Sequence, residues 1–423
     1  MNKHLFVALY CSNYSGSSTH IIEKLISGEI ELENYNFKNK NGYFYSQSTI
    51  NYLLEEEFKH DINPLKEYHK NNFSTLSSGQ KKKVLLQYYI DKCPDYILLD
   101  DVMGNIDQES QAELIQLLHQ NISKIFFVQI FYKKIDLLPL ANKLYSITDN
   151  LQLINEEISS FNSPSEDIFS FKTALPNFNQ EEIGQGNLND LVALKNVSVA
   201  YENKVILQNI NWNIKTGEFW QLKGPNGSGK TTLVGLITGD NPKAYGNDIR
   251  VMGFQKGSGE SVWQIKKYIG YFTPDMLTRF GRMDTMDKMI ISGFYDSIGL
   301  YIKPTSHQIY IANQWITLLG LSHFRKRPFY CLSSAQQRLV MIARAMVKKP
   351  LLLILDEPCT GLNDSNTQLV NQLINHIAVY SKIAIIYISH QKEPNLKPNY
   401  FFELHPMPDG AIGKIVDFDS KHL

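Results

Sequence analysis

Residues 224–232 read GPNGSGKTT, follow the apolar run EFWQLK and lead into the helical pattern TTLVGLITG. The stretch matches GxxxxGK followed by Ser or Thr, whose glycines let the backbone bend until its N–H groups face phosphate oxygens. The helix that follows adds its positive dipole end at the same place. This strand–loop–helix context argues against a glycine-rich turn that binds nothing. The predicted phosphate-binding residues are Gly224, Pro225, Asn226, Gly227, Ser228, Gly229, Lys230, Thr231 and Thr232.

Two carboxylates follow another apolar run, because LLLILD ends at Asp356 and Glu357 comes next. We predict that Lys230 reaches the β- and γ-phosphates, and that the Thr231 hydroxyl and the Asp356 carboxylate ligate Mg²⁺. Glu357 points in a different direction and is predicted to polarise a water molecule for attack on the γ-phosphate. An Asp-Glu pair after a strand is usually a loop feature, so it is the accompanying phosphate loop that favours catalysis.

The chain contains an internal repeat. LSSGQ at residues 76–80 recurs as LSSAQ at residues 332–336, which is 256 positions later. YILLDD, ending at Asp101, recurs as LLILDE, ending at Glu357, at the same separation, and SKIFFV recurs as SKIAII at a separation of 258. Three matches in one order at nearly one offset indicate two copies of one domain.

Each copy alternates short β-rich runs with helical patterns, as in LLLILDE, QLVNQLINHIAVY and KIAIIYISH, which predicts α/β domains with a largely parallel sheet. Residues 155–190 carry many acidic side chains with scattered Ser, Asn, Pro and Gly, which is typical of a linker. We therefore predict three parts. They are a degenerate domain at residues 1–154, an acidic linker at residues 155–190 and a complete domain at residues 191–423.

Composition narrows the class of protein. The 423 residues include 42 Lys and Arg against 42 Asp and Glu, so no overall field attracts nucleic acid or an anionic membrane. The four cysteines lie far apart in the sequence, which suits a reducing compartment. The longest apolar runs fall far short of the roughly 18 residues of a membrane span. We expect a cytoplasmic protein, with a peripheral position on the cytoplasmic face of the membrane as an option.

Together GPNGSGKTT, the LSxGQ-type segments, LILDEPCTGLN and the strand-end histidine of YISH resemble the ATP-binding cassette (ABC) family over nearly the whole chain. The resemblance implies two tandem P-loop NTPase domains with helical subdomains, and ATP as the nucleotide. It also implies that His390 contacts the γ-phosphate and that Tyr201 stacks on adenine. The alternatives are a surface histidine at a strand end and an ordinary strand tyrosine.

The two copies are unequal. CSNYSGSST at residues 11–19 takes the place of GPNGSGKTT, with Tyr14 for Gly227 and Ser17 for Lys230. Asp101 stands where the second copy has its catalytic glutamate, and about 43 residues are missing from the interval that holds the helical subdomain in this family. The sequence predicts a truncated N-terminal copy without tight nucleotide binding.

In the ABC family each ATP lies between two cassettes, so the resemblance implies two composite sites. The competent site would combine the C-terminal motifs with residues of the N-terminal copy, namely Ser77, Gly79, Gln80 and Asp107. The other site would combine CSNYSGSST with Ala335 and Asn363. Ala335 replaces the glycine of the LSxGQ signature segment, and Asn363 replaces the aspartate of the D-loop, the segment after the Asp-Glu pair in this family. These residues of the competent site all have the expected types, whereas both contributions to the other site are damaged, which indicates that the two copies pair within the chain.

One departure affects the competent site. After IGY the family usually places a glutamine, whereas this sequence reads FTPDM, and we predict that Asp275 serves as a metal ligand instead. A narrower resemblance, to soluble twin-cassette proteins of the ModF kind named for molybdate transport or photorepair, rests on SGFYDSIGLY and ANQWITLLGLSHF. The alternative is that these side chains simply pack a helical subdomain.

These observations predict an Mg²⁺-dependent ATPase with one competent composite site. Its expected role is the energising ATP-binding subunit of an ABC transporter, with a separate membrane permease as partner. The alternative is a soluble ABC protein that acts as a nucleotide-gated regulator or a translation-type factor. The short acidic linker argues against nucleic acid or the ribosome as a partner, because such factors usually carry two working P-loops and a long charged linker.

Overall fold

The computed structural model describes residues 6–11, 18–60, 65–68, 72–103, 106, 108–148, 150–161, 171, 174–176, 190–202, 204–279, 284–390, 393 and 395–417. The chain forms two compact units. One comprises Met1–Asp167 with Gly361–Ser365, and the other Ile168–Thr360 with Asn366–Leu423. Within the described ranges, no helix is long and apolar enough to cross a membrane.

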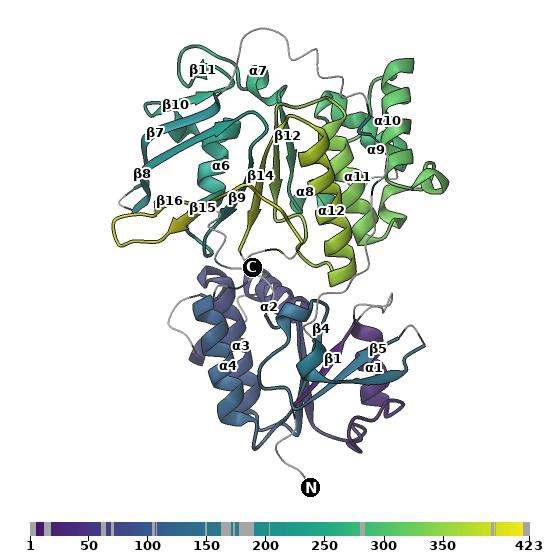
Figure 1. The fold of residues 1–423 in the computed structure, drawn as a ribbon. Helices are drawn as coiled ribbons and strands as arrows, with labels where there is room; N and C mark the ends of the chain where they lie inside the picture. Colours follow the sequence, from purple (N-terminus) through teal and green to yellow (C-terminus); the bar gives the residue numbers. More distant parts are fainter. Residues whose placement is uncertain are drawn as a thin grey trace. The chain divides into compact units, whose positions relative to one another are not determined.

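The N-terminal unit is built on a six-stranded sheet in the order β2-β3-β4-β1-β5-β6. Figure 1 labels β1, β4 and β5 of this sheet. Every neighbouring pair is parallel except β5 and β6. The central strands are almost continuously buried, as expected where helices cover both faces of a parallel sheet. The strands are β1 (Phe6–Tyr10), β2 (Gly42–Tyr45), β3 (Tyr96–Asp100), β4 (Phe126–Phe131), β5 (Lys143–Ile147) and β6 (Leu153–Glu156).

Alternate residues of these strands form two cores. Phe6 and Phe127 pack on one face with residues of α3 and α4, such as Leu85. Val7 packs on the other face with Ile21 of α1. The period-two pattern of each strand thus places helices on both sides of the sheet. The helices are α1 (Ser18–Ser27), α2 (Gln47–His60), α3 (Ser78–Asp91), α4 (Gln108–Asn121) and α5 (Ile158–Phe161), with short 3₁₀ turns at Lys66–Tyr68, Phe73–Thr75 and Lys134–Asp136.

The C-terminal unit repeats this sheet. Its six strands lie in the order β12-β13-β14-β9-β15-β16, so β9 and β12–β16 occupy the places of β1 and β2–β6. A second, antiparallel sheet in the order β11-β10-β7-β8 covers α6 and has no counterpart among the described N-terminal residues (Figure 1). The strands are β7 (Asp190–Tyr201), β8 (Lys204–Lys215), β9 (Phe219–Lys223), β10 (Asp248–Val251), β11 (Phe254–Gln255), β12 (Ile269–Phe272), β13 (Leu352–Asp356), β14 (Ala384–Ser389), β15 (Tyr400–His405) and β16 (Ile412–Asp417).

A helical subdomain packs beside the C-terminal sheet, where α9 contacts both α10 and α11 (Figure 1). In the N-terminal unit the matching interval, between β2 and α3, holds only α2 and two short 3₁₀ turns among its described residues. The predicted fold class, two ABC-type α/β domains of which the first is truncated, is confirmed. The helices of the second unit are α6 (Lys230–Thr238), α7 (Val262–Lys266), α8 (Asp275–Arg279), α9 (Met286–Ser292), α10 (Ser306–Leu318), α11 (Ser334–Met346) and α12 (Asp364–Tyr380), with 3₁₀ turns at Pro242–Ala244, Gly293–Tyr295, Ser322–Phe324 and Phe329–Cys331.

Candidate functional site

The phosphate loop joins the end of β9 to the start of α6, as its sequence predicts. Gly229 caps the helix with φ 92°, in the left-handed region that favours glycine, and a Cβ there would lie 2.7 Å from Leu207. At Gly224 a Cβ would lie 2.5 Å from the Ser228 hydroxyl oxygen and 3.0 Å from the Leu404 carbonyl oxygen. Any side chain at either position would therefore disturb the curve of the loop.

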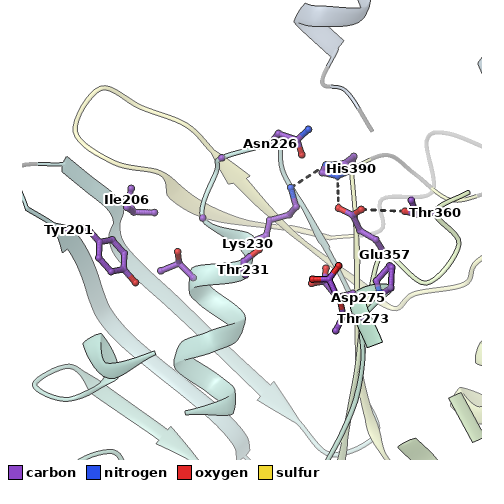
Figure 2. Close-up of a pocket in the computed structure, with 15 residues that line it drawn as sticks. Tyr201, Ile206, Asn226, Lys230, Thr231, Thr273, Asp275, Glu357, Thr360 and His390 are labelled. Atoms are coloured by element: carbon purple, nitrogen blue, oxygen red, sulfur yellow. Dashed lines mark hydrogen bonds and ion pairs between the residues drawn. The ribbon is translucent and has the colours of Figure 1, made fainter. Parts of the chain in front are cut away.

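The loop opens into a cavity of about 510 Å³ (Figure 2). This cavity brings together most of the residues that the sequence singles out in the C-terminal copy. It also includes four residues from other segments to which sequence reasoning assigned no role, namely Ile206, Thr273, Pro274 and Thr360. Gly224, Pro225 and Ser228 shape the loop but do not line the cavity. The lining residues are Tyr201, Ile206, Asn226, Gly227, Gly229, Lys230, Thr231, Thr232, Thr273, Pro274, Asp275, Asp356, Glu357, Thr360 and His390.

Lys230 is held within its own loop. Its ammonium donates to the carbonyl oxygens of Gly224 at 2.6 Å and Pro225 at 3.0 Å, and lies 3.3 Å from Nδ1 of His390. Burial lowers the pKa of Lys230, although the charges of Glu357 and Asp356 oppose this shift. The ammonium is thus kept at the mouth of the loop, where an incoming phosphate would replace carbonyl oxygens as its partner.

Glu357 lies at the turn after β13 in a left-handed conformation, with φ 46°. Its carboxylate pairs with Nε2 of His390 and accepts a 3.3 Å hydrogen bond from the Thr360 hydroxyl (Figure 2). Burial alone would raise the pKa of Glu357. The hydrogen bond and charge of His390, together with Lys230 and the Thr360 hydroxyl, outweigh burial and hold that pKa below its usual range. The ionised form, which can accept a proton from water, is therefore favoured.

Asp356 presents the second carboxylate. Burial, followed by the neighbouring Glu357 charge, raises the pKa of Asp356 to about 6, and Asp275 adds to this rise. A cation beside these carboxylates would stabilise their ionised forms. The Thr231 hydroxyl and the carboxylates of Asp356 and Asp275 form an all-oxygen donor set in the cavity, which is the chemistry that Mg²⁺ prefers.

No group of three or more His, Cys, Asp or Glu side chains in the described parts of the chain is placed to hold a metal ion by itself. This agrees with how Mg²⁺ is usually bound at phosphates, by one or two carboxylates with the phosphate oxygens and water supplying the rest. The residues present therefore fit an Mg²⁺ that arrives with a nucleotide.

Tyr201 ends β7 at the opposite side of the cavity, with 41% of the residue exposed (Figure 2). Its hydroxyl accepts a 2.7 Å hydrogen bond from the side-chain amide of Asn241, and the Lys243 ammonium lies 5.8 Å from the centre of its ring. Asn241 is buried and also caps the next short turn by accepting from the Lys243 backbone N–H. The sequence predicted Tyr201 but gave no sign of Asn241, which lies 40 positions away.

Comparison with known proteins identifies the family. A family model described as ABC transporter matches residues 207–360. The ABC transporter ATP-binding protein ModF of Escherichia coli (strain K12) is 34% identical over 364 residues, which cover 81% of this chain and 72% of ModF. This chain belongs to the ABC transporter ATP-binding protein family. The narrower resemblance to ModF is confirmed at the level of sequence similarity.

Two further matches of this ABC protein agree. An uncharacterized ABC transporter ATP-binding protein of Schizosaccharomyces pombe is 28% identical over 329 residues, which cover 75% of this chain and 65% of that protein. A chain in the structure of the complex of archaeal ribosomal stalk protein and archaeal ribosome recycling factor has a TM-score of 0.62 and 14% identity, covering 98% of this chain and 86% of that one. At that identity the likeness shows the fold alone.

In the N-terminal copy of this ABC protein, the LSSGQ segment forms the start of α3. The Ser77 hydroxyl accepts from the Gln80 backbone N–H at 3.2 Å, while the Gln80 side chain accepts from the Ser77 backbone N–H at 3.0 Å, a complete capping box. Ser333 caps α11 in the same way. A Cβ at Gly79 would lie 2.1 Å from the Ser110 hydroxyl oxygen, so glycine is required there for packing within this unit. Asp107, Tyr14 and Ser17 lie outside the described residues.

Proposed function

We propose that this ABC protein binds one Mg·ATP tightly per chain and hydrolyses it to ADP and phosphate. The observation that supports this most is the cavity that gathers Lys230, Thr231, Asp356, Glu357 and His390 around one phosphate loop. Each has the side-chain type and position that phosphoryl transfer requires, since catalysis of this reaction depends on placing charge and water rather than on covalent chemistry.

The reaction divides among these residues. The loop N–H groups and the Lys230 ammonium bind the phosphates and neutralise their charge. Thr231, Asp356 and Asp275 would hold Mg²⁺, which supplies further charge neutralisation when bound. Glu357 orients a water molecule and accepts its proton as the water oxygen bonds to the γ-phosphorus and the β–γ bridging oxygen leaves with ADP. His390 keeps the Glu357 carboxylate oriented and ionised.

We further propose that the N-terminal copy completes this site through Ser77, Gly79, Gln80 and Asp107, as in other members of the family. The support is the distribution of residue types, because the N-terminal signature reads LSSGQ while the C-terminal one reads LSSAQ. The remaining site, with Ser17 for the loop lysine and Ala335 for the signature glycine, would bind nucleotide weakly.

The proposed role is the energising subunit of an ABC transporter, working with a separate membrane permease on the cytoplasmic face of the membrane. The support is the similarity to proteins named as ABC transporter ATP-binding proteins, ModF among them. Purification from native membranes tests this role, since a multi-span membrane protein should copurify with the chain. Recovery of the chain with ribosomes and no membrane protein would contradict it.

The ATPase proposal is tested by phosphate release and by equilibrium titration with Mg·ATP, for the parent chain and Lys230→Ala. We expect one tight site in the parent. Mg·ATP at about 100 times its Kd should stabilise the fold by roughly 2.7 kcal/mol, and Lys230→Ala should abolish both this shift and turnover. Two tight sites, or turnover unchanged in Lys230→Ala, would contradict the proposal.

A further inference from the structure

A buried cation lies on α11, the helix that is capped by Ser333 of the LSSAQ segment and is called the signature helix below. It has no role in the site as described so far. Arg338 on α11 is only 8% exposed. One guanidinium nitrogen, Nη2, donates to the Thr360 carbonyl oxygen at 3.0 Å, and the guanidinium lies 5.7 Å from the centre of the Phe272 ring. Its Nε and Nη1 are buried without a hydrogen-bond partner among the described residues. Such burial is unfavourable for a charged group and requires an explanation.

The residue that Arg338 holds is in turn bound to the catalytic glutamate. Thr360 donates its backbone N–H to the Glu357 carbonyl oxygen at 3.2 Å and its hydroxyl to the Glu357 carboxylate at 3.3 Å. Glu357 itself has φ 46°, a strained conformation that persists only where the surroundings fix it. Thr360 therefore helps to fix both the strained backbone and the direction of the carboxylate, and Arg338 fixes Thr360.

The N-terminal copy has a related contact at the same position of the repeat, although its acceptors align with Glu357 and Pro358 rather than with Thr360. Lys82 lies 256 positions before Arg338, the separation of the two LSS segments. It is 4% exposed, and its ammonium donates to the carbonyl oxygens of Asp101 at 3.1 Å and Val102 at 3.2 Å, in the turn after β3. Asp101 has φ 47°, almost the value of Glu357.

In both copies, then, a buried cation on the helix that is capped by the serine of the LSS segment donates to carbonyl oxygens of the turn that follows β3 or β13. The N-terminal copy has this contact although its sequence has Ser17 where the other copy has the loop lysine. The contact is thus independent of a working phosphate loop in the same copy, so it joins the helix to the turn whether or not that copy can bind nucleotide.

We propose that Arg338 is a positioning residue that couples the signature helix α11, through Thr360, to the Glu357 carboxylate. A displacement of α11 moves the Thr360 carbonyl, and with it the hydroxyl that orients Glu357, so a shift of this helix is transmitted to the water-polarising group. The test of this inference by kcat rests on the proposed ATPase function. The contact between Arg338 and Thr360 does not depend on that function.

The test compares Arg338→Met with Arg338→Lys. Methionine fills similar volume without charge, and replacing a poorly paired buried charge by an apolar side chain is commonly neutral or stabilising, so the fold should survive. We expect Arg338→Met to lower kcat about tenfold at unchanged KM for ATP, because a misplacement of the reacting groups costs rate rather than affinity. Arg338→Lys should restore most of the rate, since Lys82 shows that a lysine at this position of the repeat can bond to carbonyl oxygens of the turn.

Thr360→Val and Thr360→Ser form the second pair, because valine removes only the hydroxyl and serine retains it. Thr360→Val should lower kcat as Arg338→Met does, and the two changes should be non-additive, since one path carries both. Unchanged kcat in Arg338→Met, failure of lysine to rescue, or additive losses would each overturn the proposal.

Amide hydrogen exchange over residues 357–360 tests whether Arg338 stabilises this turn, and the measurement does not require ATP hydrolysis. Exchange in this turn should rise in Arg338→Met, return in Arg338→Lys and stay unchanged in Lys230→Ala. Equal exchange in parent and Arg338→Met would overturn the coupling even if the parent hydrolyses ATP. If the parent has no ATPase activity, the proposed function fails while raised exchange still supports the coupling.

Discussion

The turns after β3 and β13 are the two most instructive regions to compare. Asp101 and Glu357 have φ values of 47° and 46°, and their backbone N–H groups donate to Ile130 and Ile388 at 3.1 and 3.0 Å. The backbone is therefore the same, but only the second turn has a glutamate paired with a histidine, because Tyr132 stands where the C-terminal copy has His390. The order of the strands and the points where they end determine the backbone of both turns. Two or three side chains then determine whether a turn can take part in catalysis.

The prediction with the largest expected effect tests directly whether the turns after β3 and β13 differ in function. Glu357→Gln keeps volume but cannot accept the proton of the attacking water, so kcat should fall about 10²–10⁴-fold with Mg·ATP affinity retained. The matched change Asp101→Asn should leave kcat unchanged. Steady-state phosphate release and nucleotide titration on both variants measure this. Comparable losses from the two changes would show that the turns are not functionally distinct.

The second prediction compares the two signature serines. Aspartate is as good a helix cap as serine, so Ser77→Asp and Ser333→Asp should both preserve their helices. In the proposed composite site the carboxylate introduced by Ser77→Asp would face the γ-phosphate, and a like charge at about 4 Å costs up to about 4 kcal/mol at an effective dielectric of 20. We therefore expect Ser77→Asp to lower kcat by about 100-fold, measured by steady-state phosphate release.

Ser333→Asp is the control for that prediction, because the site it would affect carries Ala335 and should hold little nucleotide. Its kcat should stay near that of the parent. A larger loss from Ser333→Asp would mean that the composite sites are assigned the wrong way round. Gly79→Asp is a poorer probe, because any Cβ at that position meets Ser110 within its own unit.

The sequence predicted those parts of the site that neighbouring residues determine. The loop of residues 224–232 and the Asp356–Glu357 pair follow from local patterns, because glycine placement and a strand end dictate their geometry without distant partners. The likeness of the two sheets was likewise accessible through the repeat. Tyr201, His390 and Asp275 were assigned by resemblance, and the structure places all three in the same cavity as the loop.

The contacts that orient these groups could not be predicted, because they join segments that the sequence does not pair. Asn241 reaches Tyr201 across 40 residues, and Arg338 reaches Thr360 across 22. One signal was available: Lys82 and Arg338 are cations at the repeat separation, each on the helix that follows an LSS segment. A cation at a core position in two copies of a domain indicates a buried partner more strongly than either copy alone.

The third prediction concerns the helical subdomain, which only the C-terminal copy shows in full among the described residues. Asp287 on α9 is buried, accepts from Lys326 at 2.7 Å and lies 3.5 Å from Arg325. Burial would raise its pKa, but the hydrogen bonds from Lys326 and Thr285 outweigh burial and lower it. Asp287→Asn should therefore reduce the free energy of unfolding by about 2 kcal/mol at neutral pH.

The pH dependence of that loss follows from the direction of the shift. A carboxyl whose folded-state pKa is depressed contributes stability in full above its unfolded value of about 3.9, and loses it as pH falls through the folded-state pKa. The difference between parent and Asp287→Asn should thus be constant from about pH 8 to 5 and shrink below about pH 4, measured by urea unfolding. Glu55→Gln, which removes an exposed pair with Lys59 on α2, should have no measurable effect. A difference that does not shrink in acid would assign the loss to packing.

The smallest expected effect is that of Tyr201→Phe. Tyr201 ends β7, a strand of the antiparallel sheet that only the C-terminal copy shows among its described residues. Tyr201→Phe keeps the ring for stacking on adenine but removes the hydroxyl that Asn241 holds. One such hydrogen bond contributes about 1 kcal/mol, so the Kd for ATP should rise about fivefold at unchanged kcat. Tyr201→Ala, which removes the stacking surface as well, should reduce the free energy of ATP binding by roughly 1–3 kcal/mol more.

Asn241→Ser is the control for this prediction. The serine can still cap the turn at Lys243 but is too short to reach Tyr201, so the variant should match Tyr201→Phe and add nothing to it in the double variant. Unchanged nucleotide affinity in Tyr201→Ala would show that this tyrosine does not stack on the base and that its bond to Asn241 serves the fold alone.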